Sequence, residues 1–337
     1  MRRRKFIGFV GAAAVSAPLW PFAVSAQQPR KQHRLAFVHS GIPADKLTAA
    51  AGPFWVKRFF ETLERLGHSE GGNLVVERYS AEGRSDRFAA LVAEVVGRKP
   101  DVIVSNLNPL IKIFLGASAT IPVVGITSDP IAGGLIASLA RPGGNLTGVS
   151  VEAGPEIIAK RLQILKEAMP SATKVTYLLA NSRPRGIDGE SYQAAKQQLG
   201  LVLTERLLSQ VDEAQLRQSF ADMAERRTDA MLLDGSGSFL AFRALLVELA
   251  AQNHIPVVYP FRDYVEQGGL MAFAPDLGEL AERMASDVHL ILDGAKAADI
   301  PFYQPSKFQL IVNLKAAKTI GIEMPATLVA RADEVIE

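Results

Sequence analysis

Polar and aromatic side chains follow the short apolar runs of this chain, at the points where each run ends. They are His39, Ser40, Asn106, Thr127, Ser128 and Asp129 in the first half, and Asn181, Asp234, Ser236, Tyr259 and Phe261 in the second. Hydroxyls and helix N-terminal N–H groups bind a carboxylate, whereas an aspartate binds an ammonium group. The two aromatic rings can stack on a planar or apolar part of a solute. These residue types predict noncovalent binding of a polar or zwitterionic small molecule.

Each polar candidate also has a purely structural alternative. Ser40, Ser128 and Ser236 precede expected helices, where a serine often serves as the N-cap. Asn106 and Asn181 belong to a residue type that also holds turns. The sequence leaves both interpretations open for these five residues.

The charged and aromatic candidates have alternatives of their own. Asp129 precedes a proline and could cap the next helix. Asp234 ends an apolar run, where an unpaired carboxylate is costly, so we expect a charged partner, either the ligand or Arg262. Phe261 fits a core position as well as a stacking position. His39 is expected to be a hydrogen-bonded cleft residue rather than a metal ligand.

The residue patterns of covalent and metal catalysis are missing from the sequence. The chain has no cysteine, which excludes disulfides, thiolate metal sites and thiol nucleophiles. None of its five histidines stands at metal-ligand spacing from another, and neither a Gly-x-Ser-x-Gly nor a phosphate-binding Gly-x-x-x-x-Gly-Lys motif is present. The glycine-rich residues 234–238 lack the third glycine of a dinucleotide fingerprint. We therefore expect no catalytic residues, no metal site and no cofactor.

The elements that must position the polar candidates occur as two similar series. The tetrapeptide Ile-Pro-Val-Val closes each series, at residues 121–124 and 255–258. Expected strands precede the first copy at residues 34–39, 73–78 and 101–105, and the second copy at residues 174–180, 201–206 and 229–233. Strands that alternate with helices of this length predict parallel, doubly wound sheets. The chain therefore reads as two copies of one βαβαβαβ unit, which predicts two α/β lobes.

Three extended segments are expected to connect the two lobes, at residues 145–151, 270–273 and 308–312. With them, lobe one comprises residues 31–147 plus 275–306, and lobe two residues 150–272 plus 308–337. Three crossings of this kind form a hinge about which two lobes close on a ligand. Ligands of open parallel sheets bind beyond the carboxyl ends of the strands, where the polar candidates stand.

The N-terminus is expected to be a cleaved export signal, residues 1–26. A basic start at residues 2–5 precedes an apolar stretch and a small-residue cleavage site, Val24-Ser25-Ala26. The segment Arg3-Arg4-Lys5-Phe6-Ile7 also fits a twin-arginine signal; a general-secretion signal and a membrane anchor are the alternatives. Residues 1–26 carry three arginines, one lysine and no acid, so cleavage changes the formal net charge from +2 to −2. We therefore expect no binding to nucleic acid.

Five local motifs resemble one protein family. They are residues 66–73 (LGHSEGGN), 79–84 (YSAEGR), 127–130 (TSDP), 138–148 (SLARPGGNLTG) and 331–336 (RADEVI). Together with the signal and the paired lobes, they resemble the ABC-transporter substrate-binding family that includes tryptophan- and tyrosine-uptake proteins. The resemblance implies a type 1 periplasmic binding protein: two doubly wound parallel-sheet lobes joined by a three-segment hinge. It also implies a monomeric periplasmic receptor that closes on an amino acid or similar small organic solute and presents it to an ABC permease.

Two other classes of function remain open from the sequence. The same pair of lobes serves as the ligand-binding sensor subunit of membrane signalling proteins. An enzyme on this fold is the less favoured alternative, because the sequence lacks the nucleophile and metal patterns given above.

Overall fold

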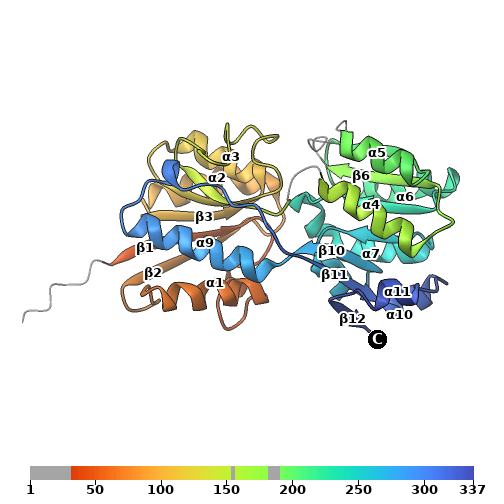
Figure 1. Ribbon diagram of the computed structural model, residues 1–337. Helices are drawn as coiled ribbons and strands as arrows, with labels where there is room; N and C mark the ends of the chain where they lie inside the picture. Colours follow the sequence, from red (N-terminus) through yellow and green to blue (C-terminus); the bar gives the residue numbers. More distant parts are fainter. Residues whose placement is uncertain (1–31, 153–155, 181–189) are drawn as a thin grey trace, which may run out of the picture. The chain divides into compact units, whose positions relative to one another are not determined.

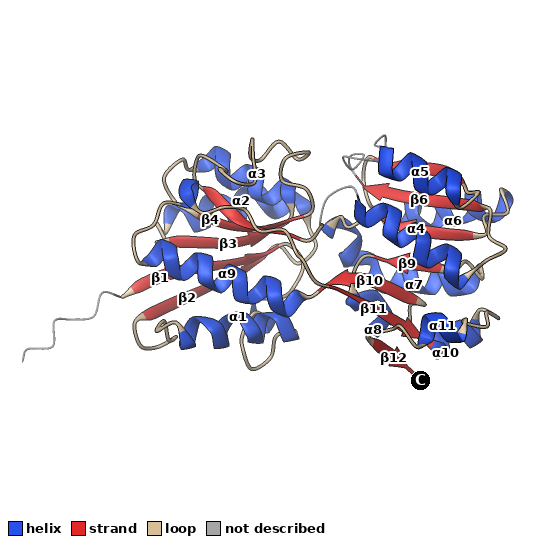
Figure 2. Cartoon of the chain, in the orientation of Figure 1, coloured by secondary structure: helices blue, strands red, loops and turns tan. Residues whose placement is uncertain are grey.

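The structure is a computed structural model, and it describes residues 32–152, 156–180 and 190–337. The expected export signal and Asn181 therefore lie outside the described residues. Two β-sheets form the centres of two α/β lobes (Figure 1), and helices cover both faces of each sheet (Figure 2). Within the described ranges, no helix has both the length and the apolar character that crossing a bilayer requires.

The first sheet has five parallel strands in the order β2-β1-β3-β4-β5. These are β1 (His33–His39), β2 (Leu74–Ser80), β3 (Val102–Asn106), β4 (Val123–Thr127) and β5 (Leu146–Ser150). The associated helices are α1 (Phe54–Arg65), α2 (Phe88–Gly97), α3 (Asn108–Ala117) and α9 (Leu277–Leu292), with 3₁₀ helices η1 (Ala44–Lys46), η2 (Ser85–Arg87) and η4 (Ala297–Asp299).

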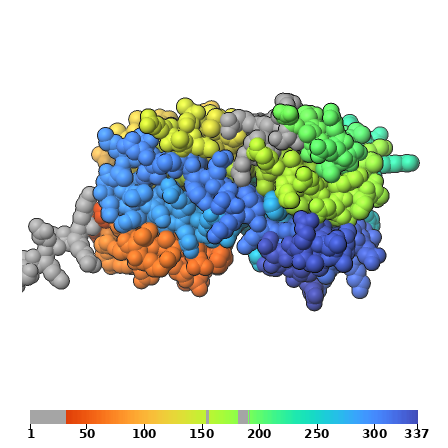
Figure 3. Space-filling model, in the orientation of Figure 1, coloured from red at the N-terminus to blue at the C-terminus, as the bar shows by residue number. Residues whose placement is uncertain are grey.

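Both faces of the first sheet are buried, which explains why its strands read as continuous apolar runs. Leu35 and Phe37 of β1 join the core that contains α1 and α9, whereas Ala36 and Val38 join the core that contains α2 and α3. Alternate side chains of one strand thus serve opposite faces. In Figure 3, α9 (blue) lies against α1 (orange) on the face shown, in agreement with their packing in one core.

The second sheet has seven strands in the order β12-β11-β10-β9-β8-β6-β7. These are β6 (Lys174–Ala180), β7 (Val202–Leu208), β8 (Ala230–Leu233), β9 (Val257–Tyr259), β10 (Met271–Pro275), β11 (Phe308–Asn313) and β12 (Glu334–Ile336). One face packs against α4 (Glu156–Ala168), α5 (Glu190–Gln198), α10 (Leu314–Thr319) and α11 (Ala326–Val329). The other packs against α6 (Glu213–Glu225), η3 (Gly237–Phe242), α7 (Arg243–Gln252) and α8 (Arg262–Glu266).

The two sheets share one topology, which confirms the prediction of two βαβαβαβ copies. The order β2-β1-β3-β4 of the first sheet recurs as β7-β6-β8-β9 in the second. The proline of each Ile-Pro-Val-Val copy accepts a backbone hydrogen bond from the neighbouring strand through its carbonyl oxygen. The N–H of Ile103 donates to the carbonyl oxygen of Pro122 at 2.9 Å, and the N–H of Met231 donates to that of Pro256 at 2.8 Å.

Two of the three expected connections turn out to be strands of the second sheet. Residues 270–273 largely belong to β10 and residues 308–312 to β11, and these strands pair antiparallel from Met271–Val312 to Pro275–Phe308. β10 also pairs in parallel with β9. The chain therefore passes between the sheets just after β5, just after β10 and just before β11. An isolated extended run in a sequence does not show which sheet it joins, and this explains the difference.

Strands β4 and β5 depend on a close approach of two glycines. Gly125 of β4 and Gly148 of β5 are register partners. Gly148 has a φ of +138°, and a Cβ there would lie 2.1 Å from the carbonyl oxygen of Gly125. The obstructing atoms belong to the backbone, so they cannot move aside as a side chain would. This pairing positions the end of β4, where Thr127, Ser128 and Asp129 lie.

We expect Gly148→Ala to lower the free energy of unfolding by more than about 2 kcal/mol, because of the clash and the unfavourable φ. Gly116→Ala in α3 is the matched control. Nothing lies within 4 Å of a Cβ at Gly116, and alanine stabilises a helix relative to glycine by about 0.5–1 kcal/mol. Urea unfolding of both variants checks this, and equal stability of the two would contradict it.

Candidate functional site

The ends of β1 and β3 in lobe one are joined by a pair of hydrogen bonds. The backbone N–H of Ser40 donates to Oδ1 of Asn106 at 2.8 Å, and Nδ2 of Asn106 donates to Oγ of Ser40 at 3.0 Å. Both residues are buried, each with 9% of its surface exposed. The two side chains bind each other and hold the neighbouring ends of β1 and β3 together.

His39 presents a partly exposed imidazole at the end of β1. Its Nδ1 accepts the N–H groups of Gly41 at 3.0 Å and Ile42 at 2.8 Å. Burial lowers the pKa of His39 to about 3, and two donors aimed at Nδ1 act in the same direction. The ring is therefore neutral, with its proton on Nε2 as a hydrogen-bond donor. This agrees with the expectation of a hydrogen-bonded histidine.

Trp55 lies beside His39, and it is not among the residues predicted from the sequence. Its ring centroid is 6.0 Å from that of His39 and 6.2 Å from that of Phe37. Trp55 is partly exposed in the first turn of α1, the helix that follows β1. The signal in the sequence was an aromatic residue just after Gly52-Pro53, at the start of a helix expected near a strand end. Trp55 offers the flat apolar surface that was predicted for Tyr259 and Phe261.

The end of β4 is shaped by backbone hydrogen bonds. Oδ1 of Asp129 accepts the N–H groups of Ile131 and Ala132, each at 3.0 Å, so Asp129 caps the turn after β4. Thr127 is buried and its Oγ1 donates to the carbonyl oxygen of Val149 at 3.4 Å. The carbonyl oxygen of Ser128 accepts the hydroxyl of Ser150. Asp129 therefore caps a turn and not the helix that was its structural alternative, while direct contact of these residues with a ligand stays a prediction.

In lobe two, Asp234 ties the end of β8 to the end of β6. Its Oδ2 accepts the N–H of Ala180 at 2.8 Å and its Oδ1 that of Ser236 at 2.9 Å. Burial raises the pKa of Asp234 to about 7, against the opposite effect of these two donors. The expected pairing with Arg262 is wrong, because the guanidinium of Arg262 binds Glu334 instead, through Nη1 and Nη2.

Ser236 has the structural role that the sequence left open. Its Oγ accepts the N–H of Ser238 at 3.3 Å, which caps η3. The serine is partly exposed. In this bond the hydroxyl oxygen is the acceptor, and the hydroxyl proton is not used. Capping and ligand contact are therefore compatible.

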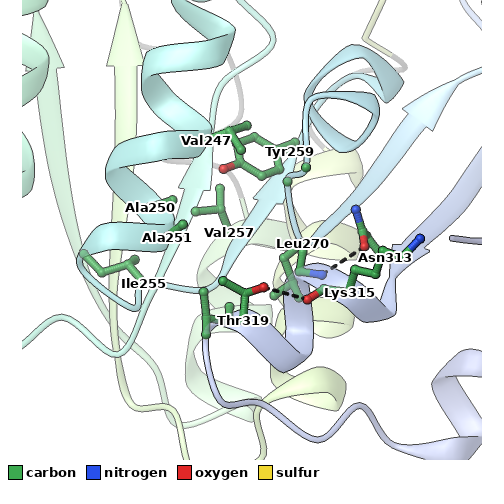
Figure 4. A pocket seen from close by; sticks show the side chains of 14 residues that line it. Val247, Ala250, Ala251, Ile255, Val257, Tyr259, Leu270, Asn313, Lys315 and Thr319 are labelled. Atoms are coloured by element: carbon green, nitrogen blue, oxygen red, sulfur yellow. Dashed lines mark hydrogen bonds between the residues drawn. The ribbon is translucent and has the colours of Figure 1, made fainter. Parts of the chain in front are cut away.

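The stacking role predicted for Tyr259 and Phe261 is corrected by their burial. Tyr259 is 1% exposed, and its ring lies parallel to that of Tyr264, with centroids 4.8 Å apart. Its side chain lines a cavity of about 210 Å³ together with residues of α7 and α10, including Val247, and with Asn313 at the end of β11 (Figure 4). Phe261 is 5% exposed and belongs to the core. Neither ring presents a free face to a solute in this structure.

A buried ion pair beside Asp234 was also missed. Nη1 of Arg161 lies 3.4 Å from Oε1 of Glu152, and Nε of Arg161 donates to the carbonyl oxygen of Phe273 at 3.2 Å. A Cβ at Gly235 would lie 2.2 Å from Oε1 of Glu152, so glycine is needed there. The pair links the segment after β5 with α4 and β10. The signal was an arginine on the apolar face of an expected helix.

Most of the chain matches one known protein family. Residues 54–336 match the family described as ABC transporter substrate binding protein. The chain belongs to this family. The family is one of substrate-binding proteins and not of enzymes.

Relatives of this substrate-binding protein extend over most of its length. A protein named tyrosine-binding protein, from Clostridioides difficile (strain R20291), is 22% identical over 269 residues, covering 79% of this chain and 76% of the relative. A crystal structure of an ABC domain in complex with L-Trp, from Streptococcus pneumonia, has a TM-score of 0.78 at 21% identity and covers 91% of this chain and 100% of that chain. A conserved domain protein from Vibrio cholerae has a TM-score of 0.78 at 23% identity, covering 90% and 100%. These structures confirm the periplasmic binding protein fold.

The depressed pKa of His39 predicts an acid-sensitive stability of the substrate-binding protein. Unfolded histidine titrates near pH 6.5 and folded His39 near pH 3, so between these values only the unfolded chain takes up this proton. Stability is therefore lost as the pH falls from about 6.5 towards 3. We expect His39→Asn, whose Oδ1 can accept the same two N–H groups, to reduce this loss by about 1–3 kcal/mol at pH 4.

Urea unfolding at pH 7 and pH 4 measures the effect of His39→Asn. His254→Asn is the control, because His254 is exposed at the end of α7. Asp234 acts in the opposite direction over part of this range, but it is present in every variant and cancels in the comparison. An unchanged pH dependence in His39→Asn would show that His39 is protonated in the folded protein.

The Glu152–Arg161 pair predicts a large, non-additive stability effect. We expect Arg161→Met to lower the free energy of unfolding by about 3–5 kcal/mol, because Glu152 is left buried without a counter-charge. Adding Glu152→Gln removes that charge and should restore part of the loss. Chemical denaturation of the two single variants and the double variant measures the coupling. Strictly additive effects would mean that the two residues do not stabilise each other.

Proposed function

We propose that this substrate-binding protein is an exported receptor of an ABC importer, and that it binds an amino acid, with aromatic amino acids as the first candidates. The names of two relatives support the solute class, since one is a tyrosine-binding protein and the other was solved with L-Trp. The basic and apolar residues 1–26 support export through a twin-arginine or general-secretion signal to the periplasm.

The observation that carries the proposal is the matched construction of the two strand edges. In lobe one Asn106 holds Ser40, and in lobe two Asp234 holds Ala180, so both edges are preorganised before a solute arrives. Preorganised edges at the carboxyl ends of parallel strands form the binding position of this kind of sheet.

The groups at the lobe-one edge suit an aromatic amino acid. Trp55 supplies an aromatic surface, and the neutral ring of His39 supplies an Nε2–H donor for a carboxylate. Oδ1 of Asn108, at the start of α3, is buried without a hydrogen-bond partner among the described residues. An ammonium group would satisfy that acceptor. Lobe two adds Asp234 and Ser236, and Asn181 and Asp129 stay proposed contacts.

We expect the protein to bind L-tyrosine, L-tryptophan or L-phenylalanine in isothermal titration calorimetry. Trp55→Ala should weaken this binding by about tenfold or more, which corresponds to a loss of about 1.4 kcal/mol or more of contact energy. Val202→Ala is the matched control, since Val202 is exposed at the opposite end of the lobe-two sheet. Absence of binding to all three amino acids would overturn the proposed solute class.

A second readout uses the fluorescence of Trp55 itself. Trp20 and Trp55 are the only tryptophans, so a Trp20→Phe chain reports from Trp55 alone. Binding of L-phenylalanine should change that fluorescence if the solute lies beside His39. Uptake of labelled solute by cells with and without the gene then separates the importer from a sensor, because only an importer receptor is needed for uptake.

A further inference from the structure

Lobe one holds a cluster of imidazoles away from the strand ends that form the proposed solute site. His68 follows α1, His289 is in the last turn of α9, and Asp293 is the C-cap of α9. The ring of His33, at the start of β1, contacts that of His68 edge-on at 5.8 Å. The residues meet because α1 packs along α9.

The distances within the cluster fit a bound metal ion. Nε2 of His68 lies 2.9 Å from Nδ1 of His289. His68, His289 and Asp293 each offer one ligand atom, and all three atoms lie within 4.8 Å of one another. Ligand atoms around a tetrahedral zinc ion are about 3.3 Å apart, given metal–ligand bonds of about 2.0–2.1 Å. The observed separations, 2.9 Å for one pair of ligand atoms and no more than 4.8 Å for any pair, lie around this value.

A second observation is the incomplete hydrogen bonding of the cluster. His68 is 94% buried, and its Nδ1 has no hydrogen-bond partner among the described residues; the same holds for Nδ1 of His33. Buried ring nitrogens are normally paired. A metal ion that takes Nε2 of His68 would replace its contact with His289.

The charge around the cluster also suits a cation. The charged groups that act on His68 are Asp293, His289 and His33, and no lysine or arginine is among them. Asp293 has 59% of its side chain exposed, and His289 28%, so an ion can enter from solvent.

We propose that His68, His289 and Asp293 bind a divalent transition metal ion, with Zn²⁺ the best match to two imidazoles and one carboxylate. Water or His33 would complete a tetrahedral shell. The ion would join the loop after α1 to the end of α9, two segments more than 200 residues apart in the sequence. The prediction of no metal site was based on the spacing of histidines along the sequence. Such spacing does not reveal ligands that come from separate elements of the fold.

The test titrates Zn²⁺ into the tag-free protein by calorimetry and records the melting temperature and the visible spectrum with Co²⁺. We expect one Zn²⁺ per chain, a raised melting temperature, and the intense absorption of tetrahedral Co²⁺. His289→Gln and Asp293→Ala should each weaken binding by at least about tenfold. Asp293 is exposed, so its variant folds even if a histidine variant does not.

His254→Gln is the matched control, because it removes an exposed histidine of lobe two and should leave Zn²⁺ affinity unchanged. Equal affinity in wild type and Asp293→Ala, or binding lost only in His254→Gln, would overturn the site. Binding of amino acids is measured separately in the same variants. The metal site does not rest on the proposed solute, so either result can fail without the other.

Discussion

One hydrogen bond, repeated in each lobe, sets the geometry of the proposed binding edge. At the end of the third strand of each copy, a side-chain oxygen accepts a backbone N–H from the end of the first strand, from Ser40 to Asn106 and from Ala180 to Asp234. Both bonds are 2.8 Å long. The two acceptors are 128 residues apart in the sequence, so they hold the same place in the repeated unit. A buried side-chain-to-backbone bond of this kind fixes the position of both strand ends.

The exchange of an amide for a carboxylate makes the two edges chemically different. The side-chain amide of Asn106 forms hydrogen bonds with Ser40. The carboxylate of Asp234 carries a charge that is costly to bury, and burial raises the pKa of Asp234 to about 7. The same region of lobe two contains the Glu152–Arg161 pair, which would be costly to bury without its internal contact. A neutral hydrogen-bonding edge and an ionisable edge together match a zwitterion, whose two charges need different surroundings. This pairing of edges gives the proposed amino-acid solute its physical basis.

The sequence predicts the fold well because the fold depends on local patterns. Continuous apolar strands, helices of regular length and the repeated Ile-Pro-Val-Val each report on their own segment, and together they predict both lobes. The site was predicted less well because it depends on direction. A residue at a strand end can be partly exposed, as His39 is, or buried in the core, as Tyr259 is. The partner of Arg262 is Glu334, 72 residues away, and no spacing rule connects them.

The same distinction explains why the cluster on α1 and α9 is not visible in the sequence. His68 and His289 meet because two amphipathic helices share one core, and only their packing decides which polar residues lie at its rim. The strand-end residues instead follow from topology, because parallel strands of one unit must end at one edge. Sites formed by topology can therefore be located from a sequence, whereas sites formed by helix packing need coordinates. Trp55 belongs to both classes, since its helix follows β1 while its exposure beside His39 depends on packing.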